Sequence, residues 1–179
     1  RAAAAARRWV AEPLPPARSV PGDPDGELTA TLVARCSQPQ QQRAVLYIHG
    51  WSDLFHQAHL AAEVESWGAD FHALDLRRYG RNIVAGQRSG WIDDLGEYDE
   101  EIDAAMGAIL ADHDSVTLMG HSTGGLIASL WADRHPHTVD GLIHTYPWLD
   151  MQGSPGCRAR ISAASCARGL GAPEALGRP

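Results

Sequence analysis

Short apolar segments alternate with amphipathic segments along the middle of the chain. Five segments rich in apolar and β-branched residues predict strands: 27–35, 44–48, 71–76, 115–119 and 139–145. Three intervening segments carry apolar residues at helical spacing and predict helices: 55–67, 94–111 and 124–135. Strands that alternate with helices of this size are typical of βαβ units. The pattern therefore predicts an α/β fold with a mostly parallel sheet.

The same pattern divides the chain into three parts. Residues 1–26 are rich in Pro, Gly, Asp and Arg and predict a flexible N-terminal segment. Residues 27–152 hold every predicted strand and helix and form one domain. Residues 153–179 show no strand or helix period and few large aliphatic residues, so we expect a disordered tail. A shifted reading frame or a truncated gene produces such an abrupt change, and a natural flexible tail is the alternative.

Composition and charge narrow the class of protein. With 179 residues and 44% hydrophobic content, the chain is long enough for one sizeable core. All fifteen basic residues are arginines scattered among acids, and the net charge is -7, which disfavours nucleic-acid binding. No apolar run approaches the roughly 20 residues that span a bilayer. Cys36, Cys157 and Cys166 form neither a disulfide framework nor a metal-binding spacing, which predicts a reducing, cytoplasmic location.

One segment carries the clearest chemistry. Gly-His-Ser-Thr-Gly-Gly at 120–125 follows a predicted strand and precedes a predicted helix. This is the context of the G-x-S-x-G nucleophile elbow, in which the serine stands on a sharp strand-to-helix turn. Gly120 and Gly124 allow the backbone to turn without a Cβ collision. We therefore predict that Ser122 is a nucleophile.

A nucleophilic serine also needs donors for the oxyanion that develops during acyl transfer. The backbone N–H of Thr123, directly after the serine, is one candidate. The other is the N–H of Trp51, in the loop that follows the strand 44–48, where His49 and Gly50 form a common entry to an oxyanion loop. We expect His49 to hold the backbone conformation of that loop. Two matched segments in the right contexts are more specific than a lone G-x-S-x-G.

Four segments, in this order and spacing, resemble the α/β-hydrolase superfamily: 45–50, 73–81, 120–125 and 146–150. The likeness is strongest to the branch of lysophospholipases, monoacylglycerol lipases and serine aminopeptidases, and it covers roughly residues 27–152. It implies helices on both faces of the sheet, Ser122 as nucleophile, and an oxyanion hole formed by the N–H groups of Trp51 and Thr123. It also implies hydrolysis of a small-molecule or lipid ester through an acyl-enzyme, without a cofactor.

The resemblance also shows what the chain lacks. In this superfamily the catalytic acid and histidine follow later strands, and a cap follows the sixth strand. After Asp150 the sequence contains no aspartate and no histidine. The resemblance thus implies a chain truncated after the sixth strand, without the last strands, the cap, the acid or the base. The alternative function is that of a catalytically incomplete fragment or pseudo-hydrolase that acts, if at all, as a non-catalytic binding module.

The other polar clusters predict structural roles. His144 lies in a predicted strand and is expected to be buried, and His121 beside Ser122 is expected to be structural because of the turn geometry. The acids at the start of the helix 94–111 match the helix dipole and are expected to form a solvated face, with a partner or metal site as the alternative. We predict no metal site at either pair of nearby histidines: His56 with His59, and His135 with His137.

Overall fold

The structure is a computed structural model that describes residues 8–15, 28–36 and 41–150. The strands in these ranges are β1 (Trp9–Pro13), β2 (Thr31–Arg35), β3 (Arg43–Ile48), β4 (Asp70–Asp75), β5 (Ser115–His121) and β6 (Gly141–Thr145). The α-helices are α2 (Ala58–Ser66), α3 (Asp99–Leu110) and α4 (Thr123–Arg134), and two 3₁₀ turns are η1 (Gly80–Asn82) and η2 (Leu95–Tyr98).

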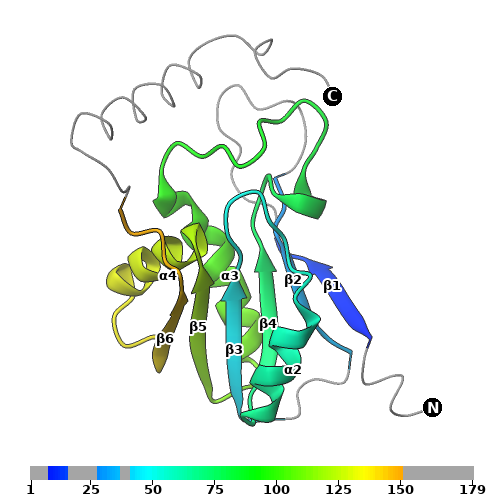
Figure 1. The fold of residues 1–179 in the computed structure, drawn as a ribbon, viewed down its shortest axis with the longest axis vertical. Coiled ribbons are helices and arrows are strands. Elements are labelled where there is room, and N and C mark those ends of the chain that lie inside the picture. Colours follow the sequence, from blue (N-terminus) through cyan, green and yellow to red (C-terminus); the bar gives the residue numbers. More distant parts are fainter. Residues whose placement is uncertain (1–7, 16–27, 37–40, 151–179) are drawn as a thin grey trace. The chain divides into compact units, whose positions relative to one another are not determined.

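The strands form one mixed sheet in the order β1-β2-β4-β3-β5-β6 (Figure 1). Strands β4, β3, β5 and β6 run parallel, and β1 and β2 are antiparallel to their neighbours. Helix α2 packs on one face, and α3 and α4 pack on the other. The predicted α/β class, the mostly parallel sheet and the helices on both faces are confirmed.

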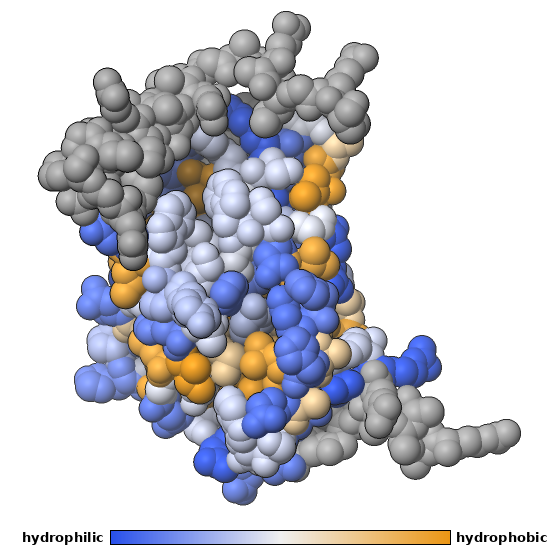
Figure 2. All heavy atoms as spheres, in the orientation of Figure 1, coloured by the Kyte–Doolittle hydropathy of each residue, from blue (hydrophilic) through white to orange (hydrophobic). Residues whose placement is uncertain are grey.

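Two apolar clusters, one on each face, explain why the central strands are apolar throughout. Residues of β3 such as Leu46 and Ile48 pack under α3 and α4, whereas Val45 and Tyr47 pack under α2. A strand covered on both faces buries both sets of alternating side chains, so it lacks the polar positions of a half-exposed strand. On the face in view in Figure 2, apolar residues appear in separate groups among polar ones.

The N-terminal region differs from the expected flexible segment at Trp9–Pro13. These residues form β1, which pairs with β2 at the edge of the sheet. The ring of Trp9 lies 4.7 Å from that of Phe55, and the Arg35 guanidinium lies 4.1 Å above the indole. The packing of Trp9 and the pairing of β1 with β2 thus hold this segment as a strand, although its composition is typical of a loop. The rest of the expected flexible segment, except residues 8 and 14–15, and the expected tail 153–179 lie outside the described residues.

The predicted helix 94–111 begins with η2 and continues as α3. Asp94 caps its start, since its Oδ1 accepts from Gly96 N–H at 2.7 Å and its own N–H donates to Glu97 at 3.2 Å. The expected solvated acid face is wrong for Glu101, which is 3% exposed. Its carboxylate accepts hydrogen bonds from the backbone N–H and the guanidinium of Arg77, a residue that follows β4. The spacing of residues along the helix does not predict this partner, because Arg77 lies 24 residues away in the sequence.

Candidate active site

Ser122 lies on the turn between the end of β5 and the start of α4. Its backbone angles are φ 52° and ψ -119°, a region that residues other than glycine rarely occupy. Its main-chain groups are fully paired. The N–H donates to Thr145 O at 3.1 Å, and the carbonyl accepts from the N–H groups of Gly125 at 3.0 Å and Trp148 at 2.9 Å. The surrounding backbone therefore holds the serine in a strained conformation, as a nucleophile elbow requires.

The two flanking glycines permit close contacts between backbones. A Cβ on Gly120 would lie 2.5 Å from Gly125 Cα and 2.6 Å from Gly124 O. A Cβ on Gly124 would collide with the carbonyl oxygens of Ile48 and His49. The first turn of α4 consequently rests directly on the end of β5 at Gly120 and on the end of β3 at Gly124, which explains the need for both glycines.

The loop after β3 lies against the serine. A Cβ placed on Gly50 would be 3.1 Å from Ser122 Cβ and 3.2 Å from Cδ2 of His121. Trp51 follows Gly50 directly, and Thr123 is the first residue of α4. The fold thus brings together the two segments in which the sequence analysis placed the oxyanion donors. The roles of these N–H groups remain predictions.

His49 fixes one peptide of this loop. The side chain is buried, its Nε2 lies 3.1 Å from the Leu76 N–H, and its Nδ1 lies 2.7 Å from Gly50 O. Because Leu76 N–H is a donor, Nε2 must accept, and Nδ1–H therefore donates to Gly50 O. Burial lowers the pKa of His49, which favours this neutral form. In a trans peptide the Gly50 carbonyl and the Trp51 N–H point in opposite directions, so the bond to one orients the other.

The remaining histidines near the elbow are engaged elsewhere. His121 Nδ1 lies 3.1 Å from Thr145 Oγ1. The expectation that His144 is buried is wrong. Strand β6 is the last strand of the sheet within the described residues, and His144 on it is exposed, 3.1 Å from Ser129 Oγ. Among the described residues, no histidine nitrogen lies within hydrogen-bond distance of Ser122 Oγ.

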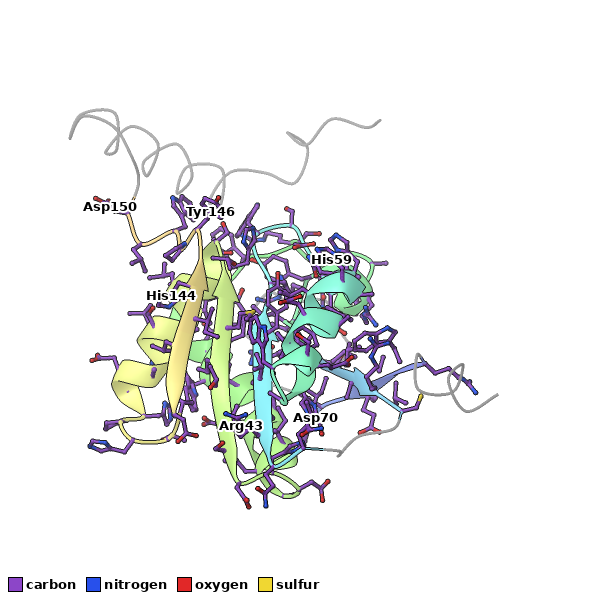
Figure 3. The ribbon with its side chains drawn as sticks, turned by 60° about the horizontal axis from the view of Figure 1, so that its bottom comes forward. Arg43, His59, Asp70, His144, Tyr146 and Asp150 are labelled. Carbon is purple, nitrogen blue, oxygen red and sulfur yellow. The ribbon has the colours of Figure 1, made fainter. Side chains whose placement is uncertain are left out.

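A second group of histidines lies at the opposite end of the sheet, and the sequence analysis missed it. His113 Nε2 lies 3.1 Å from Asp70 Oδ2, and the His72 ring packs edge-on against that of His113, with centroids 5.2 Å apart. Figure 3 shows Asp70 at the lower end of the sheet, far from Tyr146 at the upper end near the elbow. His72 is 7% exposed, and neither of its nitrogens has a partner among the described residues.

We expect this environment to make the fold sensitive to acid. Burial, reinforced by the neighbouring His113 and opposed by Asp70, lowers the pKa of His72 to about 4. The unfolded chain takes up this proton near pH 6.5, whereas the folded protein resists it until about pH 4, so the free energy of unfolding falls as pH drops through that window. Between pH 7 and pH 4, we expect the free energy of unfolding to fall less in His72→Phe than in the parent protein, by up to about 3 kcal/mol.

Urea denaturation at several pH values measures the effect. His59→Phe, at an exposed position on α2 (Figure 3), is the matched control and should keep the acid sensitivity of the parent protein. Parallel pH profiles for the parent and His72→Phe would show that His72 is not the responsible group.

The described residues hold no group of three or more His, Cys, Asp or Glu side chains arranged to bind a metal ion. Within the same ranges, no helix has the length and apolar character to cross a membrane. The cytoplasmic location and the absence of nucleic-acid binding stay predictions.

Comparison with known proteins identifies the family. The family model described as "Serine aminopeptidase, S33" matches residues 39–171, a range that includes β3, the elbow and β6. The chain belongs to the serine aminopeptidase S33 family.

Individual relatives of this S33 chain are distant. Methylesterase 7 of Arabidopsis thaliana is 27% identical over 118 residues, which are 64% of this chain and 43% of that protein. A monoglyceride lipase from Saccharomyces cerevisiae superposes with a TM-score of 0.60 at 21% identity, covering 86% of this chain and 52% of that one. A protein described as a predicted CIB-like hydrolase from Thermoplasma acidophilum gives a TM-score of 0.54 at 20% identity, covering 78% of this chain and 63% of that one. These structures establish the α/β-hydrolase fold, and the S33 chain spans about half the length of the proteins it matches.

Proposed function

We propose that the chain carries the nucleophile of a serine hydrolase that cleaves carboxylic esters through an acyl-enzyme on Ser122. The observation that carries the proposal is the backbone of Ser122, held at positive φ on a strand-to-helix turn with Gly50 beside it. A strained residue whose conformation is over-determined by its surroundings is characteristic of functional sites. The family and the names of the relatives, a methylesterase and a monoglyceride lipase, support an ester substrate.

The geometry supports a two-step reaction. Ser122 Oγ attacks the carbonyl carbon, a C–O bond forms, and the electron pair of the carbonyl moves onto oxygen. The N–H groups of Trp51 and Thr123 donate to this oxyanion, an effect worth roughly 3–4 kcal/mol for one donor. The oxyanion then collapses, the C–O bond to the alcohol breaks, and the alcohol leaves with the proton that a general base took from Ser122. Water then hydrolyses the acyl-serine to release the acid.

The reaction needs a general base to take the serine proton, and no described histidine contacts Ser122 Oγ. This observation favours a second candidate, that the described residues bind an ester or another ligand without cleaving it. Covalent reactivity of Ser122 distinguishes the two candidates.

We expect a fluorophosphonate probe to label the folded chain at Ser122, and Ser122→Ala to abolish that labelling. The probe reacts only with a serine that is activated and has oxyanion donors in place, because its phosphoryl oxygen develops the same charge. Mass spectrometry of the labelled peptide locates the adduct.

Ser129→Ala is the matched control. This serine donates to Gly125 O at 2.8 Å and lies 3.1 Å from His144 Nε2, but we expect it to be unreactive because the N–H groups around it are paired inside α4 and none is left for an oxyanion. Folded parent protein without labelling would overturn the hydrolase proposal for this chain and leave the binding function. If labelling occurs, esters and amides with the same acyl group are compared, and the proposal requires turnover of the esters.

A further inference from the structure

Tyr79 contacts the loop of His49, Gly50 and Trp51, here named the oxyanion loop, on both sides of Gly50. It follows β4, is 4% exposed, and its ring centroid lies 5.0 Å from that of His49 and 5.9 Å from that of Trp51. Both contacts are edge-to-face, with interplanar angles of 66° and 85°. This is a favourable geometry for aromatic pairs. A single side chain thus bridges the two residues that flank Gly50.

Tyr79 is itself held from the other side. Its phenol group hydrogen bonds with that of Tyr98, which is 1% exposed and ends the 3₁₀ turn η2 before α3. Tyr79 and Tyr98 belong to the same apolar cluster as the helices α3 and α4. The aromatic contacts therefore connect the oxyanion loop to the core of the domain.

Gly90 completes the support for the Trp51 ring. A Cβ on Gly90 would lie 3.1 Å from Cζ and Oη of Tyr79 and 3.2 Å from Cη2 of Trp51. The Gly90 N–H donates to Arg78 O at 2.8 Å, and its φ is +64°. Trp51 is 57% exposed, yet the tip of its ring and the phenol group of Tyr79 both lie against Gly90.

We propose that Tyr79 is a positioning residue of the oxyanion loop, which acts through His49 and Trp51 to set the peptide between Gly50 and Trp51. That peptide carries the Trp51 N–H on one side and the Gly50 carbonyl, bonded to His49, on the other. If the ring of His49 or of Trp51 shifts, the planar peptide between Gly50 and Trp51 rotates. The Trp51 N–H then turns away from Ser122. The catalytic consequence rests on the proposed function, whereas the effect on the loop conformation does not.

Two substitutions separate the contacts of Tyr79. Tyr79→Leu removes the ring, and Tyr79→Phe keeps the ring and loses only the bond to Tyr98. With the fluorophosphonate probe, we expect Tyr79→Leu to lower the maximal labelling rate by roughly 10–100-fold with little change in the half-saturating concentration, because it misplaces a donor and leaves the binding surface. Tyr79→Phe should restore most of the rate.

Phe71→Leu is the matched control. It deletes an equally buried ring from the other apolar cluster, where Phe71 contacts Tyr47 and Phe55 and neither His49 nor Gly50 is a member. We expect a similar loss of thermal stability with a labelling rate close to that of the parent. Equal losses of rate in Phe71→Leu and Tyr79→Leu would overturn the proposal, because general destabilisation would then explain both.

Amide hydrogen exchange provides a readout that does not depend on reactivity. We expect Tyr79→Leu to accelerate exchange in the peptide 46–54, and Tyr79→Phe and Phe71→Leu to leave it near the parent rate. If the parent protein is not labelled, the proposed function fails, and exchange still decides whether Tyr79 holds the loop. Unchanged exchange in Tyr79→Leu would contradict the proposal.

Gly90→Ala perturbs the same contacts if Tyr79→Leu does not fold. At φ +64° the added Cβ also strains the Gly90 backbone itself. The added methyl group presses on Tyr79 and Trp51 without deleting either ring. We expect faster exchange in 46–54 and slower labelling. If Gly90→Ala shows the exchange rate and the labelling rate of the parent protein, the assignment of Tyr79 as a positioning residue is overturned.

Discussion

Gly124→Ala is expected to destabilise the protein by about 3 kcal/mol or more, because its methyl group has no space to occupy. The atoms that it meets are the main-chain carbonyl oxygens of Ile48 and His49, at the end of a central strand. A flexible side chain moves aside at small cost, but these carbonyls move only if β3 or α4 shifts as a whole. The midpoint of urea denaturation measures the loss.

Gly107→Ala is the matched control for this substitution. Gly107 also lies in an α-helix, and a Cβ there has nothing within 4 Å. We expect a gain of about 0.5–1 kcal/mol, since alanine favours the helix over glycine. Opposite signs for two identical substitutions would show that backbone packing at the elbow, and not helix propensity, determines the outcome. A loss at Gly124 no larger than about 1 kcal/mol would contradict this account.

Arg77→Met is expected to cost about 3–5 kcal/mol, because it leaves the buried Glu101 carboxylate without its partner. Arg77 is 1% exposed; its Nε lies 2.5 Å from Glu101 Oε1, and its Nη2 donates to Glu97 O at 3.0 Å and to Glu100 at 2.9 Å. Burial raises the pKa of Glu101 to about 7 even with Arg77 present. Without that guanidinium, Glu101 should take up a proton above neutral pH.

Arg134→Met provides the comparison for an exposed ion pair. Arg134 pairs with Asp99 at 2.5 Å, but its side chain is 37% exposed, so the expected loss is about 1 kcal/mol or less. The double variant Arg77→Met/Glu101→Met should recover most of the loss, because it removes both buried charges. If the double variant is less stable than Arg77→Met alone, the cost comes from lost packing and not from an unpaired charge.

The sequence predicted the fold well where local patterns and long-range packing agree. The apolar run of β3 and the glycines around Ser122 indicate a buried strand and a sharp turn, and the structure contains both. It predicted less where a partner lies far along the chain. The burial of Glu101 depends on Arg77, and the formation of β1 as a strand depends on the contact of Trp9 with Phe55. Neither partner lies at a fixed distance along the sequence, so a periodic pattern does not identify it.

The candidate site shows the same division. Motif context predicted Ser122, Thr123 and the loop at Trp51, because the elbow constrains residue types over a few positions. Tyr79 carries no such signal, since a tyrosine after a strand is compatible with many loops. Its importance arises only once the fold brings β4 beside β3 and places the Tyr79 ring against His49 and Trp51.

The pairing of Ser122 with Thr145 and Trp148 limits where this protein tolerates engineering. Nicking, circular permutation or fusion of a reporter within 145–148 would disturb the placement of the Thr145 carbonyl and the Trp148 N–H, which keep the serine backbone in its unusual conformation. A split version cut in that segment would have to rebuild both hydrogen bonds across two polypeptides before its serine regained its geometry.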